Sequence, residues 1–189
     1  MANKYTYQVL RDTTTDAVIK LTGTFDGTSN EMNVSRISAN TLANALANNG
    51  NLLANSNANT ALPYYDLQLT GLKYYVNFPA TTPLGSVEIF WSGNNATGTA
   101  ASAYANSATI FHLNAQGEFG LGEQLPSILN NASAGITGGN GDIGVATQGA
   151  TANSAYTLII SVRKNNAMYQ RGQLNDPAAF NYGPYKLTP

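Results

Sequence analysis

The chain of 189 residues is sparsely charged, because Asp, Glu, Lys and Arg make up 10% of it, against roughly a quarter in an average soluble domain. Nine basic residues balance ten acidic ones, and 24 residues are asparagine. The absence of cysteine excludes disulfides, thiolate metal sites and cysteine nucleophiles, and no basic cluster indicates nucleic-acid binding. Uncharged amides enter an interface without the desolvation cost of a charge, so a structural protein is the first hypothesis.

The chain is long enough for one domain that folds without disulfides or a bound metal. No apolar run approaches the ~20 residues that a transmembrane helix requires. The N-terminus lacks the apolar segment of a secretory signal. We therefore expect a protein that is made in the cytoplasm and has no membrane partner.

The dominant sequence period is two, which places apolar side chains on one face of a strand. This alternation is typical of antiparallel sheets with one solvated face. Gly- and Asn-rich connections separate the alternating stretches, which favours an all-β fold, an antiparallel β-sandwich of jelly-roll type. The apolar positions of the five predicted strands are Tyr5, Tyr7 and Val9; Ala17, Ile19, Leu21 and Phe25; Tyr65, Leu67 and Leu69; Val87, Ile89 and Trp91; and Tyr156, Leu158, Ile160 and Val162.

One short helix is predicted from Thr41 to Ala47, with Asn40 as its N-cap and Gly50 near its C-cap. The dipeptide Arg163-Lys164 is expected to end a strand rather than to bind nucleic acid.

The sandwich body is expected to span residues 1–167, followed by an extended C-terminal arm at residues 168–189. The arm has three prolines and no clean period, which argues against regular pairing. Its large side chains should dock on the body or on a neighbouring molecule, and aromatic residues and Arg dominate interface energetics. The predicted partner-binding residues are Tyr169, Arg171, Phe180, Tyr182 and Tyr185.

Candidate catalytic and metal-binding residues are few. His112 is the sole histidine, and no local partner suggests its activation, so an ordinary strand histidine is expected. Asp142 lies in a glycine-rich loop with Asn140, which supplies too few carboxylates for calcium. We predict no metal and no cofactor.

Two pairs of carboxylates lie close enough in sequence to share a loop, Asp12 with Asp16 and Glu118 with Glu123. A glycosidase needs two carboxylates across a saccharide cleft, and nothing in the sequence indicates that arrangement. We therefore predict no catalytic site, and a protein that is not an enzyme.

Several stretches resemble small virion structural proteins of marine tailed phages, such as cyanophages. The resemblance implies a virion component that binds the major capsid protein and copies of itself as a trimer or other ring. Its implied role is that of a decoration or cement protein on the capsid exterior. The stretches are residues 5–14 (YTYQVLRDTT), 17–23 (AVIKLTG), 87–91 (VEIFW), 141–144 (GDIG) with 152–157 (ANSAYT), and 169–173 (YQRGQ) with 175–183 (NDPAAFNYG).

Two alternatives stay open from the sequence. A tail, collar or fibre-associated virion protein would show the same composition and the same arm. A carbohydrate-binding receptor-recognition module would stack Trp91 or exposed tyrosines on a sugar, although Trp91 has the core parity of its strand.

Overall fold

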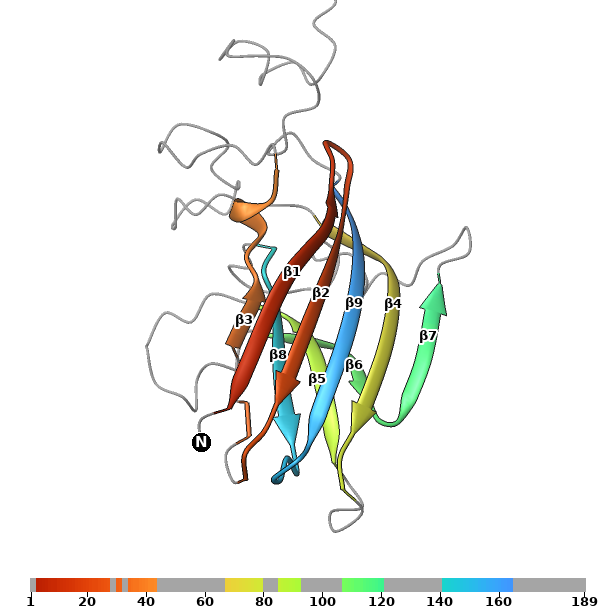
Figure 1. Cartoon of the computed structure of the whole chain (residues 1–189). Helices are drawn as coiled ribbons and strands as arrows, with labels where there is room; N and C mark the ends of the chain where they lie inside the picture. Colours follow the sequence, from red (N-terminus) through yellow and green to blue (C-terminus); the bar gives the residue numbers. More distant parts are fainter. Residues whose placement is uncertain are drawn as a thin grey trace, which may run out of the picture.

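The computed structural model describes residues 3–27, 30–31, 34–43, 67–79, 85–92, 107–120 and 141–164. Within these ranges the chain forms nine strands and one short 3-10 helix, at Ala39–Thr41. In chain order the strands are β1 (Lys4–Asp12), β2 (Asp16–Thr24), β3 (Val34–Ile37), β4 (Leu67–Asn77), β5 (Ser86–Trp91), β6 (Ala108–Leu113), β7 (Gln116–Gly120), β8 (Ile143–Gln148) and β9 (Ala155–Lys164), as labelled in Figure 1.

The strands form two antiparallel sheets that face each other. One has five strands in the order β1-β2-β9-β4-β7, and the other has four in the order β3-β8-β5-β6 (Figure 1). Fully buried side chains of both sheets share one core, for example Ile19 and Leu158 from the first and Ile89 and Val145 from the second. The prediction of an all-β antiparallel sandwich is confirmed.

Strand β9 lies at the centre of the five-stranded sheet, between β2 and β4. Its apolar alternation is fully used, because Tyr156, Leu158, Ile160 and Val162 are all buried. Ile160 pairs with Ile19 of β2 on one side and with Leu72 of β4 on the other. The alternation therefore marks a strand with one face in the core and both edges hydrogen-bonded.

The helix predicted from Thr41 to Ala47 is not confirmed. Leu42 has extended backbone angles, φ −70° and ψ 149°, and its side chain lies in the core. Tertiary contacts use the neighbouring amides instead, since the Ala43 N–H donates to Asp12 at 2.7 Å. Residues 44–50 lie outside the described residues, as does the predicted boundary between residues 167 and 168.

Candidate functional site

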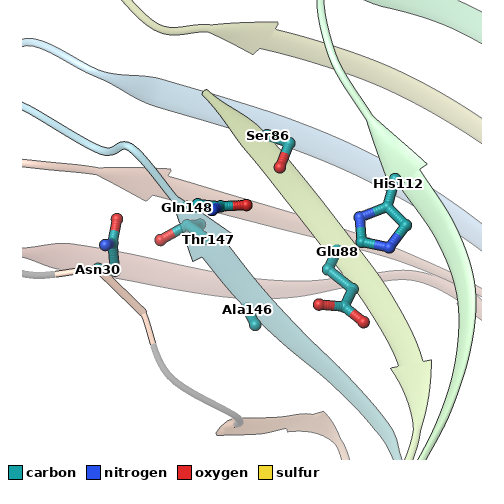
Figure 2. Close-up of a pocket in the computed structure, with 7 residues that line it drawn as sticks. All are labelled: Asn30, Ser86, Glu88, His112, Ala146, Thr147 and Gln148. Atoms are coloured by element: carbon teal, nitrogen blue, oxygen red, sulfur yellow. The ribbon is translucent and has the colours of Figure 1, made fainter. Parts of the chain in front are cut away.

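A hollow of about 240 Å³ lies against the four-stranded sheet, over β5, β6 and β8. Its residues Ser86 and Glu88 alternate along β5 with the core residue Val87, so they point away from the core. The short Ala146 lies directly opposite Glu88, and this small side chain leaves the space open. The lining residues, shown in Figure 2, are Asn30, Ser86, Glu88, His112, Ala146, Thr147 and Gln148.

Cross-strand register brings the polar lining together. Glu88 pairs with His112 on β6, and Ser86 pairs with Gln148 on β8. The hydroxyl of Thr109 donates to the Glu88 carboxylate. In the part of the chain that the structure describes, Glu88 makes no ion pair, and it is the one carboxylate among the described lining residues.

Two of the lining residues are fixed by backbone hydrogen bonds. The side-chain oxygen of Asn30 accepts the Ala150 N–H at 2.9 Å. The hydroxyl oxygen of Thr147 accepts the Glu31 N–H at 2.7 Å. One wall of the hollow is therefore held in place before any ligand arrives.

The hollow shows no nucleophile-base pair. Among the described residues no hydrogen bond joins Ser86, Glu88 and His112, although all three line the same space. His112 lies exposed on β6, which confirms its placement on a strand. Across the described ranges, no cluster of three His, Asp or Glu side chains could hold a metal ion.

A second candidate site is the edge strand β1. Among the described residues this outermost strand pairs with β2 alone, and Tyr7, Val9 and Leu10 are 45%, 44% and 48% exposed. The register shifts between Val9 and Arg11, so Leu10 is the extra residue of a β-bulge. The opposite edge of the same sheet, β7, is shorter and carries Glu118 in an exposed ion pair with Lys73. Native sheets protect their edges with short strands, charges and bulges. Strand β1 has nine residues, and its charged residues Lys4, Arg11 and Asp12 lie toward its ends, which leaves an uncharged middle.

The apolar residues of β1 continue the rim of the core. Tyr5 packs edge-on against Phe25, with ring centroids 6.0 Å apart. Tyr7 has the same parity but lies nearly half exposed. Burial raises the pKa of the Tyr7 phenol, and the nearby Asp12 carboxylate raises it further, so Tyr7 is neutral at physiological pH.

A buried lysine joins three parts of the chain at the end of β9. Lys164 is fully buried and donates to the Asp12 carboxylate at 2.5 Å, to the Thr13 carbonyl at 2.6 Å and to the Ala43 carbonyl at 2.7 Å. All three donors of the ammonium group therefore have partners, which a buried charge requires. The lysine links β9 to the β1–β2 turn and to the segment that follows the 3-10 helix.

A second buried cluster joins β1, β3 and β9. The buried Glu31 carboxylate accepts hydrogen bonds from the Tyr156 hydroxyl at 2.8 Å and from the Arg36 guanidinium. Arg36 also lies over the Tyr5 ring, 3.9 Å from its centroid. Burial raises the pKa of Glu31, and the hydrogen bonds from Arg36 and Tyr156 oppose this in part. Burial and the Glu31 carboxylate together raise the pKa of Tyr156.

The carboxylates singled out in the sequence have structural partners. Asp12 and Asp16 flank the β1–β2 turn, as their spacing suggested, but Asp12 binds Lys164 while Asp16 binds Arg11. Burial is the largest single influence on the pKa of Asp16 and raises it, but the hydrogen bonds from Thr15 and Thr13 and the Arg11 charge together lower this pKa overall. Asp142 accepts the Ala39 N–H at 2.7 Å.

Several predicted residues lie outside the described residues. These are Asn140, Glu123 and the five predicted partner-binding residues Tyr169, Arg171, Phe180, Tyr182 and Tyr185. Trp91 lies in the core with 0% exposure, so it cannot stack on a sugar outside the protein. The carbohydrate-binding role considered for Trp91 is therefore wrong.

The sequence analysis missed the buried lysine and the hollow. The sequence did contain a signal for the buried lysine. Lys164 falls on the same alternating positions of its strand as the apolar residues Tyr156, Leu158, Ile160 and Val162. A charge at a core position implies a buried partner. The hollow had no such signal, since it depends on which residues of three strands lie opposite one another.

Comparisons with known proteins give little. No family model matches the chain, and neither does any curated protein. Among solved structures, a chain described as Cucumber Leaf Spot Virus matches at 14% identity with a TM-score of 0.21. The match covers 90% of this chain and 55% of that one, so the present chain spans about half of its length. At this TM-score the likeness supports no conclusion about fold or function.

Within the described ranges, no helix is long and apolar enough to cross a membrane.

Proposed function

We propose that this protein is a structural component of a tailed-phage virion, a decoration or cement protein that binds the capsid exterior and stabilises the shell. It would be made in the host cytoplasm, reside in the virion, and bind the major capsid protein and copies of itself in a ring. The observation that carries the proposal is the long edge strand β1, whose uncharged middle exposes Tyr7, Val9 and Leu10. The resemblance of the sequence to phage virion proteins agrees with it.

The strand order supports a jelly roll as the finer description of the sandwich. Counting the eight strands from β2 to β9, the first, eighth, third and sixth form one sheet. The second, seventh, fourth and fifth form the other. This order is the one expected of two interlocked Greek keys, and jelly rolls are common in viral capsid proteins. Strand β1 would be an addition that extends the first sheet as a hairpin partner of β2.

The β1 edge suits assembly for two physical reasons. A strand with one unpaired side offers backbone donors and acceptors to a strand of another molecule. Three large apolar side chains within four residues, Tyr7, Val9 and Leu10, would leave water when such a strand arrives. The arm at residues 168–189 would supply further contacts through its aromatic residues and Arg171. A cement protein that binds the assembled shell better than its separate parts stabilises the shell by mass action.

The first test is the copy number in purified particles, measured by quantitative mass spectrometry against the major capsid protein. A ratio near that of the capsid protein, or a simple fraction of it, is expected for a decoration protein. A few copies per particle would instead support the tail or collar alternative. Complete absence from particles would refute a virion role.

The second test is deletion of residues 170–189. We expect the truncated protein to keep its cooperative thermal unfolding, since the described sandwich ends at Lys164. We also expect it to lose its place on capsids in a pelleting assay. Full occupancy by the truncated protein would show that the arm makes no contact that matters for binding.

A further inference from the structure

The hollow over β5, β6 and β8 is separate from the surface on which the virion proposal rests. It belongs to the four-stranded sheet, whereas β1 is the edge of the five-stranded one. Its polar lining is also unlike the apolar β1 edge. A ligand of the hollow therefore need not be the partner that pairs with β1.

The groups around the hollow define the ligand they would accept. Ser86, Gln148 and His112 present hydroxyl, amide and imidazole groups, and Glu88 presents the one carboxylate (Figure 2). The hydroxyl, amide and imidazole groups can donate as well as accept hydrogen bonds, whereas the carboxylate accepts them. Among the described residues no Lys or Arg lines the space, which disfavours an anion. Ala146 is the one apolar side chain in this described lining, which disfavours a hydrophobic ligand.

We propose that this hollow binds one ring of a neutral saccharide. A ring of vicinal hydroxyls offers alternating donors and acceptors, which is what this lining can match on several sides at once. The volume of about 240 Å³ lies below the roughly 300–1,000 Å³ of sites for drug-sized ligands, so the hollow suits a ligand of about one ring. The second oxygen of Glu88 would accept a sugar hydroxyl while the first keeps Thr109.

Some lining groups are held by hydrogen bonds within the protein, and others are free to move toward a ligand. Asn30 uses its oxygen on Ala150, which leaves its NH₂ group to donate to a ligand. Thr147 uses its oxygen on Glu31 and can still donate its hydroxyl proton. Gln148 is exposed and adapts to the ligand. With no aromatic platform among the lining residues, the affinity for a single ring should be weak, on the order of a millimolar Kd.

The test measures binding of methyl glycosides of glucose, galactose, mannose and N-acetylglucosamine to the full chain by saturation-transfer NMR. We expect at least one of them to bind. Gln148→Ala and Glu88→Gln should each weaken it about tenfold, because each removes a hydrogen bond worth about 1.4 kcal/mol in the tenfold conversion. Matched controls are Gln116→Ala and Glu118→Gln, which change the same residue types on the exposed edge strand β7.

Each outcome bears on the proposal. Loss in the two variants of the hollow with retention in the two controls supports it. Absence of binding by all four glycosides overturns it, as does equal loss in variants and controls. Binding of methylguanidinium chloride in place of any glycoside would overturn it too, and would show that Glu88 receives a cation. A glycan array with the same variants then separates a free sugar from the terminal ring of a glycan. The copy number in particles is unaffected by either result, so this inference and the virion proposal fail independently.

Discussion

At the scale of single residues, the buried polar groups show where tertiary structure constrains the sequence most. Lys164 ends β9 with all three ammonium donors bound, one of them to Asp12. Glu31 keeps two partners in a fully buried position. Each of these groups is tolerated because it is hydrogen-bonded. Since Lys164 bonds to Asp12 and Glu31 to Tyr156, both far away in sequence, these bonds form only when the fold is correctly assembled.

Removal of the buried ammonium group should destabilise the fold strongly. Lys164→Met leaves Asp12 and two carbonyls without their donor, which typically costs about 3–5 kcal/mol for a buried pair. Arg163→Met is the matched control, because Arg163 is exposed on the same strand, and its effect should stay within about 0.5 kcal/mol. Urea unfolding of both variants measures the difference. Equal stabilities would show that the lysine contributes nothing through these bonds.

The pKa of Glu31 predicts a pH dependence with a definite sign. Burial raises its folded pKa above the ordinary value of 4.5, so between the two pKa values the folded state holds a proton that the unfolded state has lost. Stability from this group is full below pH 4.5 and falls as pH rises through the folded pKa. Glu31→Gln cannot ionise and lacks that slope. The unfolding free energy of the wild type minus that of Glu31→Gln should therefore decrease with rising pH.

Urea unfolding at several pH values from about 4 to about 7 checks this. Glu118→Gln, which removes an exposed carboxylate on β7, serves as the control and should show a flat difference. A difference for Glu31→Gln that grows with pH would mean that the bonds to Arg36 and Tyr156 outweigh burial.

Gly23 should resist even the smallest substitution. It pairs with Tyr156 across β2 and β9, and a Cβ at Gly23 would lie 2.4 Å from a ring carbon of that buried tyrosine. Gly23→Ala must displace a packed ring, which typically costs about 1–3 kcal/mol. Gly120→Ala is the control, because nothing lies within 4 Å of the added carbon. The two thermal unfolding midpoints compare them, and equal midpoints would show that the Tyr156 ring moves freely.

At the scale of elements, the alternating pattern predicted β1, β2, β4, β5 and β9, and it missed β3, β6, β7 and β8. Strand β8 has five buried residues in succession, Gly144 among them, so it shows no alternation. Strand β7 has two glycines in five residues. The pattern reports one buried and one exposed face, and it is silent on a strand that departs from this arrangement.

Strand β1 shows that the alternating pattern can also occur on a strand that is not buried. Tyr5, Tyr7 and Val9 alternate as core residues would, yet Tyr7 and Val9 lie nearly half exposed at the edge of the sheet. Alternation does not reveal which strand occupies the edge, because that depends on pairing between distant segments. The candidate sites follow the same rule, since the hollow depends on cross-strand register that the sequence does not display.

A lysine on β1 should separate assembly from folding. Val9→Lys places a charge on the exposed edge, which blocks pairing with another strand and changes stability by no more than about 0.5 kcal/mol. Tyr75→Lys is the control, because Tyr75 is an exposed apolar residue on β4, away from either edge. We expect Val9→Lys to unfold at the wild-type temperature and to lose capsid occupancy in a pelleting assay. Loss with Tyr75→Lys alone would move the contact to the outer face of the sheet.

At the scale of the whole molecule, the described part of the chain is a two-sheet sandwich with a shared core, a partly apolar edge strand and a polar hollow. Eight charged side chains of the described part form four ion pairs, of which Lys164–Asp12 and Arg36–Glu31 are largely buried. The buried pairs hold segments of the fold together, which agrees with the proposed structural role.

The central position of β9 also sets the order in which the protein can fold. Strand β2 is made early, but its partner β9 follows more than a hundred residues later, and long-range pairing of this kind folds slowly, in milliseconds to seconds. During synthesis the apolar face of the β1–β2 hairpin therefore stays exposed until β9 has been made. An incomplete chain that stops before residue 155 would lack the middle of its larger sheet, and such species aggregate readily. An incomplete chain is therefore expected to aggregate or to be degraded.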